Sequence, residues 1–141
     1  MKLSYCFIVA MHLLVGQLCL AQEINWSSSK NWKLYNIHNK AGFNYPVDTL
    51  VHIKSINLNN DTMHAMLRNA VIWPKEKTSV WMGLYIATYE GEDNKIKKVI
   101  ISSYGGFFYL QSSKRYYQIP AEQTAKWFEW LNDNSKKIDH E

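Results

Sequence analysis

The chain has 141 residues, which fits one domain and leaves little room for a second. Apolar residues make up 47% and charged residues 20%, as in an ordinary globular protein, so collagen-like, coiled-coil and multi-span membrane classes are excluded. The formal net charge of +4 is small, and composition alone names no activity.

The first 21 residues have the layout of a secretory signal peptide. Lys2 supplies a positive charge near the start, and an apolar stretch follows over 5–15. Ala21 then offers the small residue that a signal peptidase requires, which places cleavage before Gln22. We therefore expect a secreted or periplasmic protein with no stable membrane span after cleavage.

Two other interpretations of this segment stay open. A retained membrane anchor needs an unbroken apolar run, whereas His12 and Gly16 interrupt this one and no basic cluster follows it. Lipid attachment at Cys19 needs a lipoprotein motif, which the preceding residues do not resemble. With cleavage, Cys6 and Cys19 both leave, so the mature chain excludes disulfides, cysteine nucleophiles and thiolate metal sites.

The N-terminal part of the mature chain gives weak signals. The polar, serine-rich residues 22–30 indicate a loose leading segment. Alternation over 32–38 predicts a short strand, and 39–42 predict a turn. The apolar residues of 47–58 have an ambiguous period, and we expect a strand or an extended segment there.

A helix is predicted from residue 60 or 61 onward. Asn60 or Asp61 can cap it, because a short side-chain oxygen accepts a hydrogen bond from a free N–H group of the first turn. Four apolar residues within 63–70 then fall at i, i+3, i+4 and i+7, which is one helical stripe. Pro74 forbids continuation, so the helix ends by about Val71.

Residues 79–119 predict an antiparallel meander. In 80–90 the even positions form an apolar core face, and the odd positions are aromatic and small, as on a face that something else covers. Further strands are expected over 96–103, 107–111 and 115–119, separated by polar turns.

The glycine pair and the C-terminal segment complete the pattern. Gly105 and Gly106 predict a tight turn with positive φ, or a bulge within one long strand. Pro120 can begin a last helix, whose apolar stripe lies over 124–131. Residues 135–141 are polar and predict a frayed tail.

Together these elements predict an α+β fold. An antiparallel β-meander of about four strands carries two helices packed on one face, with one or two N-terminal strands added. The predicted organisation is a signal peptide over 1–21, a single domain over 22–134 and a polar tail over 135–141.

No constellation of catalytic residues or metal ligands stands out. The acidic turn at 90–95 lacks the order of an EF-hand, which favours a solvated turn. The chain has no G-x-S-x-G, no phosphate loop and no dinucleotide-binding glycine motif. We therefore assign no catalytic residue, metal site or cofactor. The remaining histidines lack the i, i+4 spacing of a helical zinc site; they are His38, His52, His64 and His140.

The positive charge gives little support for nucleic-acid binding. Lysine pairs are scattered along the chain, and Arg68 and Arg115 are its only arginines. Arginine dominates base and phosphate recognition, so we expect no nucleic-acid partner.

The aromatic residues of the predicted meander are the most suggestive feature. A solvent-facing row of rings would be a binding platform for a glycan, a peptide or an envelope protein. The alternative is that both sheet faces are covered and the rings belong to the core. The candidate contact patch is Trp81, Tyr85, Tyr104, Arg115 and Tyr117.

The sequence thus favours a non-catalytic ligand- or protein-binding module of the cell envelope over an enzyme. A small envelope hydrolase with a histidine or carboxylate site is the first alternative, and a structural envelope component is the second. The hydrolase requires a pocket that brings His38, His52 or His64 within hydrogen-bond reach of an acid.

Overall fold

The computed structural model describes residues 24–35, 37, 45–74, 83–102 and 106–140. The predicted signal peptide and the predicted turn at 39–42 lie outside this part of the chain. The strands are β1 (Lys30–Tyr35), β2 (Ser55–Asn57), β3 (Val71–Trp73), β4 (Gly83–Glu90), β5 (Ile96–Ser102), β6 (Phe107–Leu110) and β7 (Arg115–Gln118).

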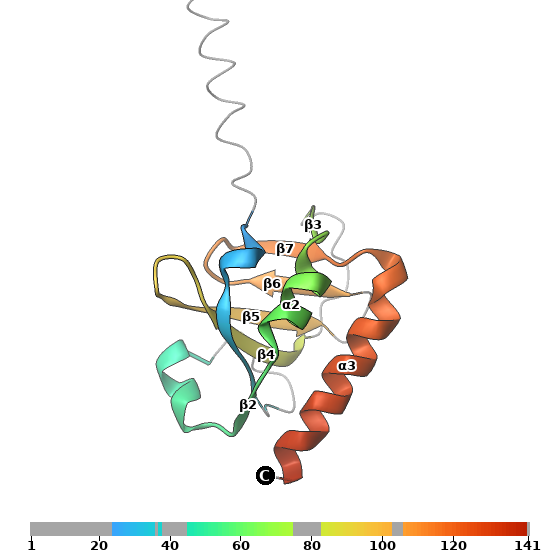
Figure 1. Cartoon of the computed structure of the whole chain (residues 1–141). Coiled ribbons are helices and arrows are strands. Elements are labelled where there is room, and N and C mark those ends of the chain that lie inside the picture. The colour runs from blue at the N-terminus through green and yellow to red at the C-terminus, as the bar shows by residue number, and fades with distance from the viewer. Residues whose placement is uncertain (1–23, 36, 38–44, 75–82, 103–105, 141) are drawn as a thin grey trace, which may run out of the picture.

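These strands form one antiparallel sheet in the order β2-β1-β4-β5-β6-β7-β3 (Figure 1). The mixed α and β content and the antiparallel sheet are confirmed. The sheet of seven strands is wider than predicted, because β3 adds itself beyond β7 at one edge. Val71 pairs with Gln118 and Trp73 with Tyr116. A strand of three residues is too short to show a period in the sequence.

The first helix, α2 (Asn60–Leu67), is shorter than predicted. Its cap is Asn59 rather than Asn60 or Asp61, and the Asn59 side-chain oxygen accepts from the Thr62 N–H at 2.9 Å. The helix ends at Leu67 rather than near Val71, since the chain leaves it to form β3.

The last helix, α3 (Ala121–His140), is longer than predicted. The prediction of a frayed tail from residue 135 is wrong, because Ile138 is only 1% exposed. Ile138 lies seven residues after the buried Leu131, so it returns to the apolar stripe that Trp127 begins. Its isolated position among polar residues hid this repeat from the sequence analysis.

The described part of the segment predicted to be loose, residues 24–30, is ordered. Residues Trp26–Ser28 form a 3-10 helix, η1, and the Trp26 side chain is 6% exposed. The Trp26 ring lies 5.7 Å from the Phe108 ring and 5.9 Å from the Tyr89 ring, measured between centroids. An aromatic anchor therefore fixes this serine-rich stretch against the sheet.

The ambiguous segment 47–58 is not one strand. It begins with a second 3-10 helix, η3 (Val47–His52), and only its end forms β2. Leu50 of η3 packs with Tyr35 and Ile86 in a small cluster. This explains the mixed period, because two kinds of element share the segment.

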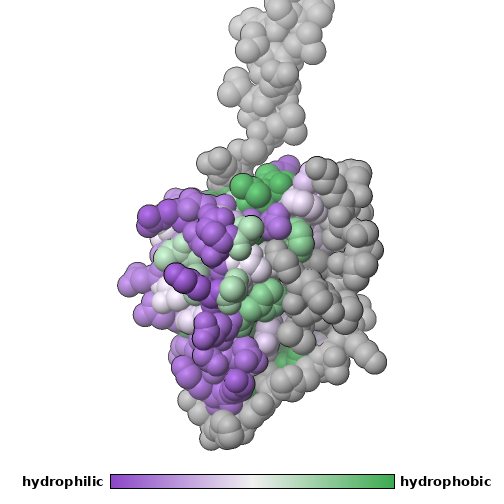
Figure 2. Space-filling model, turned by 90° about the vertical axis from the view of Figure 1, so that its right-hand side faces the viewer, coloured by the Kyte–Doolittle hydropathy of each residue, from purple (hydrophilic) through white to green (hydrophobic). Residues whose placement is uncertain are grey.

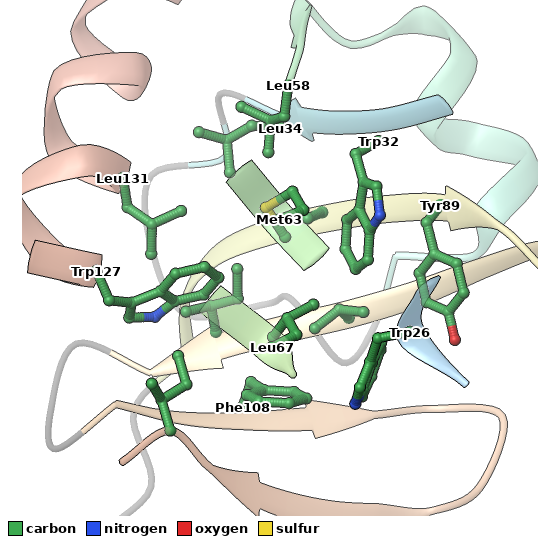
Figure 3. Close-up of a cluster of buried hydrophobic side chains, with 14 of the residues drawn as sticks. Trp26, Trp32, Leu34, Leu58, Met63, Leu67, Tyr89, Phe108, Trp127 and Leu131 are labelled. Carbon is green, nitrogen blue, oxygen red and sulfur yellow. The ribbon is translucent and has the colours of Figure 1, made fainter. Parts of the chain in front are cut away.

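Both faces of the sheet are covered around β4. Ala87 and Tyr89 belong to a large cluster that includes residues of α2 and α3, whereas Ile86 belongs to the small cluster beside η3. Figure 3 shows Trp127 of α3 and Leu67 of α2 within the large cluster, with Tyr89 at its edge. The larger core thus lies on the odd positions of β4, and the even positions face the smaller one.

Gly106 has the positive φ that its sequence context predicts, at +67°. A Cβ atom there would also meet the Thr124 hydroxyl at 2.9 Å, so glycine serves both the backbone conformation and the close approach of α3. Gly105 lies outside the described residues.

Hydrophilic side chains dominate the described surface in Figure 2, and hydrophobic ones lie in small separate areas. Within the described ranges, no helix has both the length and the apolar character needed to cross a membrane.

Candidate functional site

A pocket of about 560 Å³ opens at the end of the sheet where the β4–β5 and β6–β7 turns lie. The turns and η1 lie on the same side of the molecule in Figure 1. None of the described lining residues belongs to α2 or α3. The pocket is therefore a continuation of the larger core face, at the end that the helices leave uncovered.

Residues of the large cluster form the inner wall of the pocket. Tyr89, Leu110 and Tyr117 all line it, and all three are less than 5% exposed. The Trp26 ring holds the two tyrosines apart, with its centroid 5.9 Å from each tyrosine ring. This wall is consequently part of the packed core and is held in place by it.

Burial changes the ionisation of one of these tyrosines. The pKa of Tyr89 is raised well above its usual value by burial, with smaller electrostatic contributions from Tyr117 and Asp93. The Tyr89 hydroxyl therefore stays protonated at neutral pH. A protonated phenol can donate and accept one hydrogen bond each to a bound molecule.

The rim beside η1 consists of Ile24, Asn25 and Ser28. The Asn25 side-chain amide donates to the Glu92 carboxylate at 3.1 Å, and the Ser28 hydroxyl donates to the Asn25 main-chain oxygen at 2.8 Å. These bonds connect η1 to the β4–β5 turn, although the two are far apart in the sequence.

The β4–β5 turn supplies Gly91 and Glu92, and the first residues of β5 supply Lys97. The Asn94 N–H donates to the Gly91 oxygen at 2.9 Å, which confirms the predicted turn. The Lys97 ammonium lies 3.5 Å from the Asp93 carboxylate and would be 2.8 Å from a Cβ atom on Gly91. Glycine at position 91 thus leaves room for the lysine side chain at the pocket.

The β6–β7 turn supplies Ser112, Ser113 and Arg115. Lys114 has a positive φ of 55°, so the chain turns sharply between the serines and the arginine. Arg115 is half-buried, and among the described residues its guanidinium has no hydrogen bond or ion pair. The pocket therefore contains a cation without a protein counter-ion in the described part of the chain.

The structure places the predicted contact residues in three situations. Arg115 and Tyr117 line the pocket, although Tyr117 is only 4% exposed. Tyr85 is half-buried against the large cluster and does not line the pocket. Trp81 and Tyr104 lie outside the described residues.

The sequence analysis missed most of the pocket. The missed residues come from three separate segments, and only the strand order brings them together. Asn25 precedes η1, Lys97 is near the start of β5, and Ser112 and Ser113 are in the β6–β7 turn. One sequence signal could have found them. Lys97 and the two serines lie in or beside the predicted turns that follow the first and third strands of the meander. Alternate turns of an antiparallel meander, such as β4–β5 and β6–β7, lie at the same end of the sheet.

The histidines do not form an acid–base pair in the described structure. The His64 ring nitrogen lies 2.7 Å from the main-chain oxygen of Ser29, and His52 is exposed. His38 and the side chain of His140 lie outside the described part. The described residues contain no group of three or more metal-binding side chains.

A buried lysine lies on the opposite face of the sheet. Lys98 is 1% exposed and donates to the main-chain oxygen of Tyr45. Burial lowers the pKa of its ammonium group. Its position beside η3 separates it from the pocket.

Comparison with known proteins gives no relative. No family model matches the chain, and no curated protein or solved structure matches it. The function must therefore be argued from the pocket and its chemistry.

Proposed function

We propose that the protein is an exported, non-catalytic binding module that takes a saccharide in the hairpin-end pocket. The observation that carries this proposal is the composition of the pocket: tyrosine rings on the inner wall and hydroxyl, amide and charged groups on the rims. Sugars carry many hydroxyls, which the hydroxyl, amide and charged groups of this lining can bind through hydrogen bonds. A volume of about 560 Å³ suits a ligand of one or two sugar rings.

Export belongs to the same proposal. The layout of residues 1–21 supports it, since a charged start, an apolar stretch and a small residue before the cut are typical of a signal peptide. The intact mass of the protein from its native host checks this part. The proposal predicts a chain that begins at Gln22, and a retained leader would contradict it.

The pocket chemistry favours binding over hydrolysis. A glycosidase needs two carboxyl groups that flank the scissile bond. Among the described lining residues, Glu92 alone carries a carboxylate, and it already accepts from Asn25. A structural envelope component would not need a polar pocket, so this alternative has less support.

Blocking the pocket tests the binding proposal. We expect calorimetry to detect cellobiose or chitobiose binding to the protein, and Ser113→Trp to abolish it because an indole at this exposed turn would fill the pocket mouth. The matched control is Gln111→Trp, which adds the same side chain to an exposed position of the same turn that does not line the pocket.

The two variants separate pocket blocking from a general effect on the turn. Unchanged binding by Gln111→Trp together with lost binding by Ser113→Trp supports the proposal. Equal binding by Ser113→Trp and the unmodified protein would contradict it. The absence of binding to either saccharide and to acidic relatives of cellobiose would also overturn it.

A further inference from the structure

The charged side chains around the pocket differ in whether another described residue pairs with them. The Lys97 ammonium lies 3.5 Å from the Asp93 carboxylate, and the Glu92 carboxylate accepts from the Asn25 amide at 3.1 Å. Arg115 has no such partner among the described residues. The pocket thus presents one cation whose counter-ion the described chain does not provide.

The strand register directs this cation to the pocket. Arg115 pairs with Leu110 across the β6–β7 ladder, and both residues line the pocket. Tyr117 follows two positions later, so its side chain leaves β7 on the same face. The Arg115 side chain consequently leaves the sheet on the same face as Tyr117, at the pocket.

The lack of a counter-ion among the described residues matters because Arg115 is half-buried. Removing a charged group from water is unfavourable unless a partner replaces the lost hydration. A guanidinium also offers donors in a planar fork, which fits the two oxygens of a carboxylate or a phosphate. Arg68, the other arginine, is exposed at the end of α2 and lines no part of this pocket.

Glu92 gives the site an orientation. It lies on the β4–β5 turn, whereas Arg115 begins β7 after the neighbouring turn, so the two charges belong to different rims (Figure 1). A carboxylate accepts hydrogen bonds from sugar hydroxyls and repels an anion. A ligand with one anionic end would direct that end toward Arg115 and its hydroxyls toward Glu92.

We infer that the saccharide carries an anionic group, a carboxylate or a phosphate, that pairs with Arg115. This inference rests on the proposed function and specifies the class of saccharide. It requires no covalent step, because the ligand binds and leaves unchanged.

Three probes that differ at one position test the inference. They are cellobiose, cellobiouronic acid, in which a carboxylate replaces the terminal hydroxymethyl group, and cellobiose phosphorylated at that hydroxymethyl group. We expect at least one acidic probe to have an affinity about 10-fold higher than that of cellobiose, or more, because charge-assisted hydrogen bonds are stronger than neutral ones. The stronger acidic probe identifies the anionic group.

Substitutions of the two arginines test whether Arg115 causes the preference for acidic probes. Arg115→Gln is expected to remove the preference, so that the acidic probes bind no more tightly than cellobiose does. Arg68→Gln serves as the matched control and should change neither affinity. Arg115→Lys keeps the charge and loses the planar fork, so we expect an intermediate affinity.

The outcomes distinguish this inference from the proposed function. Cellobiose binding that Ser113→Trp abolishes, without any preference for an acidic probe, would overturn the inference and leave the saccharide pocket standing. An equal loss of neutral and acidic binding in Arg115→Gln would also overturn it. Failure of all three probes would overturn the proposed function itself.

Discussion

A single residue, Trp26, holds the serine-rich N-terminal segment against the sheet. Three serines follow it, and they favour a loose segment when read alone. Its ring nevertheless packs against Trp32, Tyr89, Phe108 and Tyr117. These partners come from four strands, so no local sequence pattern could reveal the contact.

Trp26→Ala should therefore destabilise the whole protein. We expect the free energy of unfolding, measured with denaturant, to fall by about 3–5 kcal/mol, because the large cluster loses a buried indole and gains a cavity. Val51→Ala is the control, since Val51 is 70% exposed and its truncation should change stability by less than about 0.5 kcal/mol. Similar small effects of both changes would show that Trp26 is not part of the core.

Tyr89 predicts a specific loss of stability at alkaline pH. Above about pH 10 the unfolded chain loses the phenolic proton, whereas burial keeps the Tyr89 pKa in the folded chain higher. The stability contribution is thus complete below the unfolded pKa and is lost as pH rises through the folded one.

Tyr89→Phe tests this sign. The variant keeps the ring that stacks on Trp32 at 4.5 Å and removes the titrating group. Denaturant unfolding across the alkaline range should show a smaller loss of stability in Tyr89→Phe than in the unmodified protein. Parallel losses in the two proteins would contradict the assignment to Tyr89.

Among the secondary-structure elements, the sequence predicts best those with a long, regular pattern of apolar residues. The antiparallel strands and both helices follow from alternation, turn residues and helical stripes. Their ends are less certain, because tertiary contacts determine them. Ile138 extends α3 into a polar segment, and β3 forms only because β7 offers an edge.

Ile138→Ala tests the corrected length of α3. We expect the free energy of unfolding to fall by about 2–5 kcal/mol, the usual result of truncating a buried isoleucine. Lys137→Ala changes the exposed neighbour and should have an effect below about 0.5 kcal/mol. If Ile138→Ala proved as neutral as Lys137→Ala, the last turns of α3 would not pack as described.

At the scale of the whole molecule, the packing of the sheet explains which part of the candidate site was predictable. The alternation of β4 places Tyr85 and Tyr89 on one face, but it does not say that α2 and α3 cover that face. Arg115 and Tyr117 were predicted as contact residues, and they meet Lys97 and Ser113 only through the order of the strands. The pocket is thus a property of the assembled sheet.

The most direct test is an amide NMR map of the isotopically labelled protein titrated with cellobiouronic acid. We expect chemical-shift changes to gather at the hairpin end, over Gly91, Ser112, Ser113 and Arg115, and to leave β3 and η3 unchanged. Changes centred on β3 or η3 would contradict a saccharide site in this pocket, as would no change with cellobiouronic acid, with the phosphorylated probe and with cellobiose at any concentration that their solubility permits.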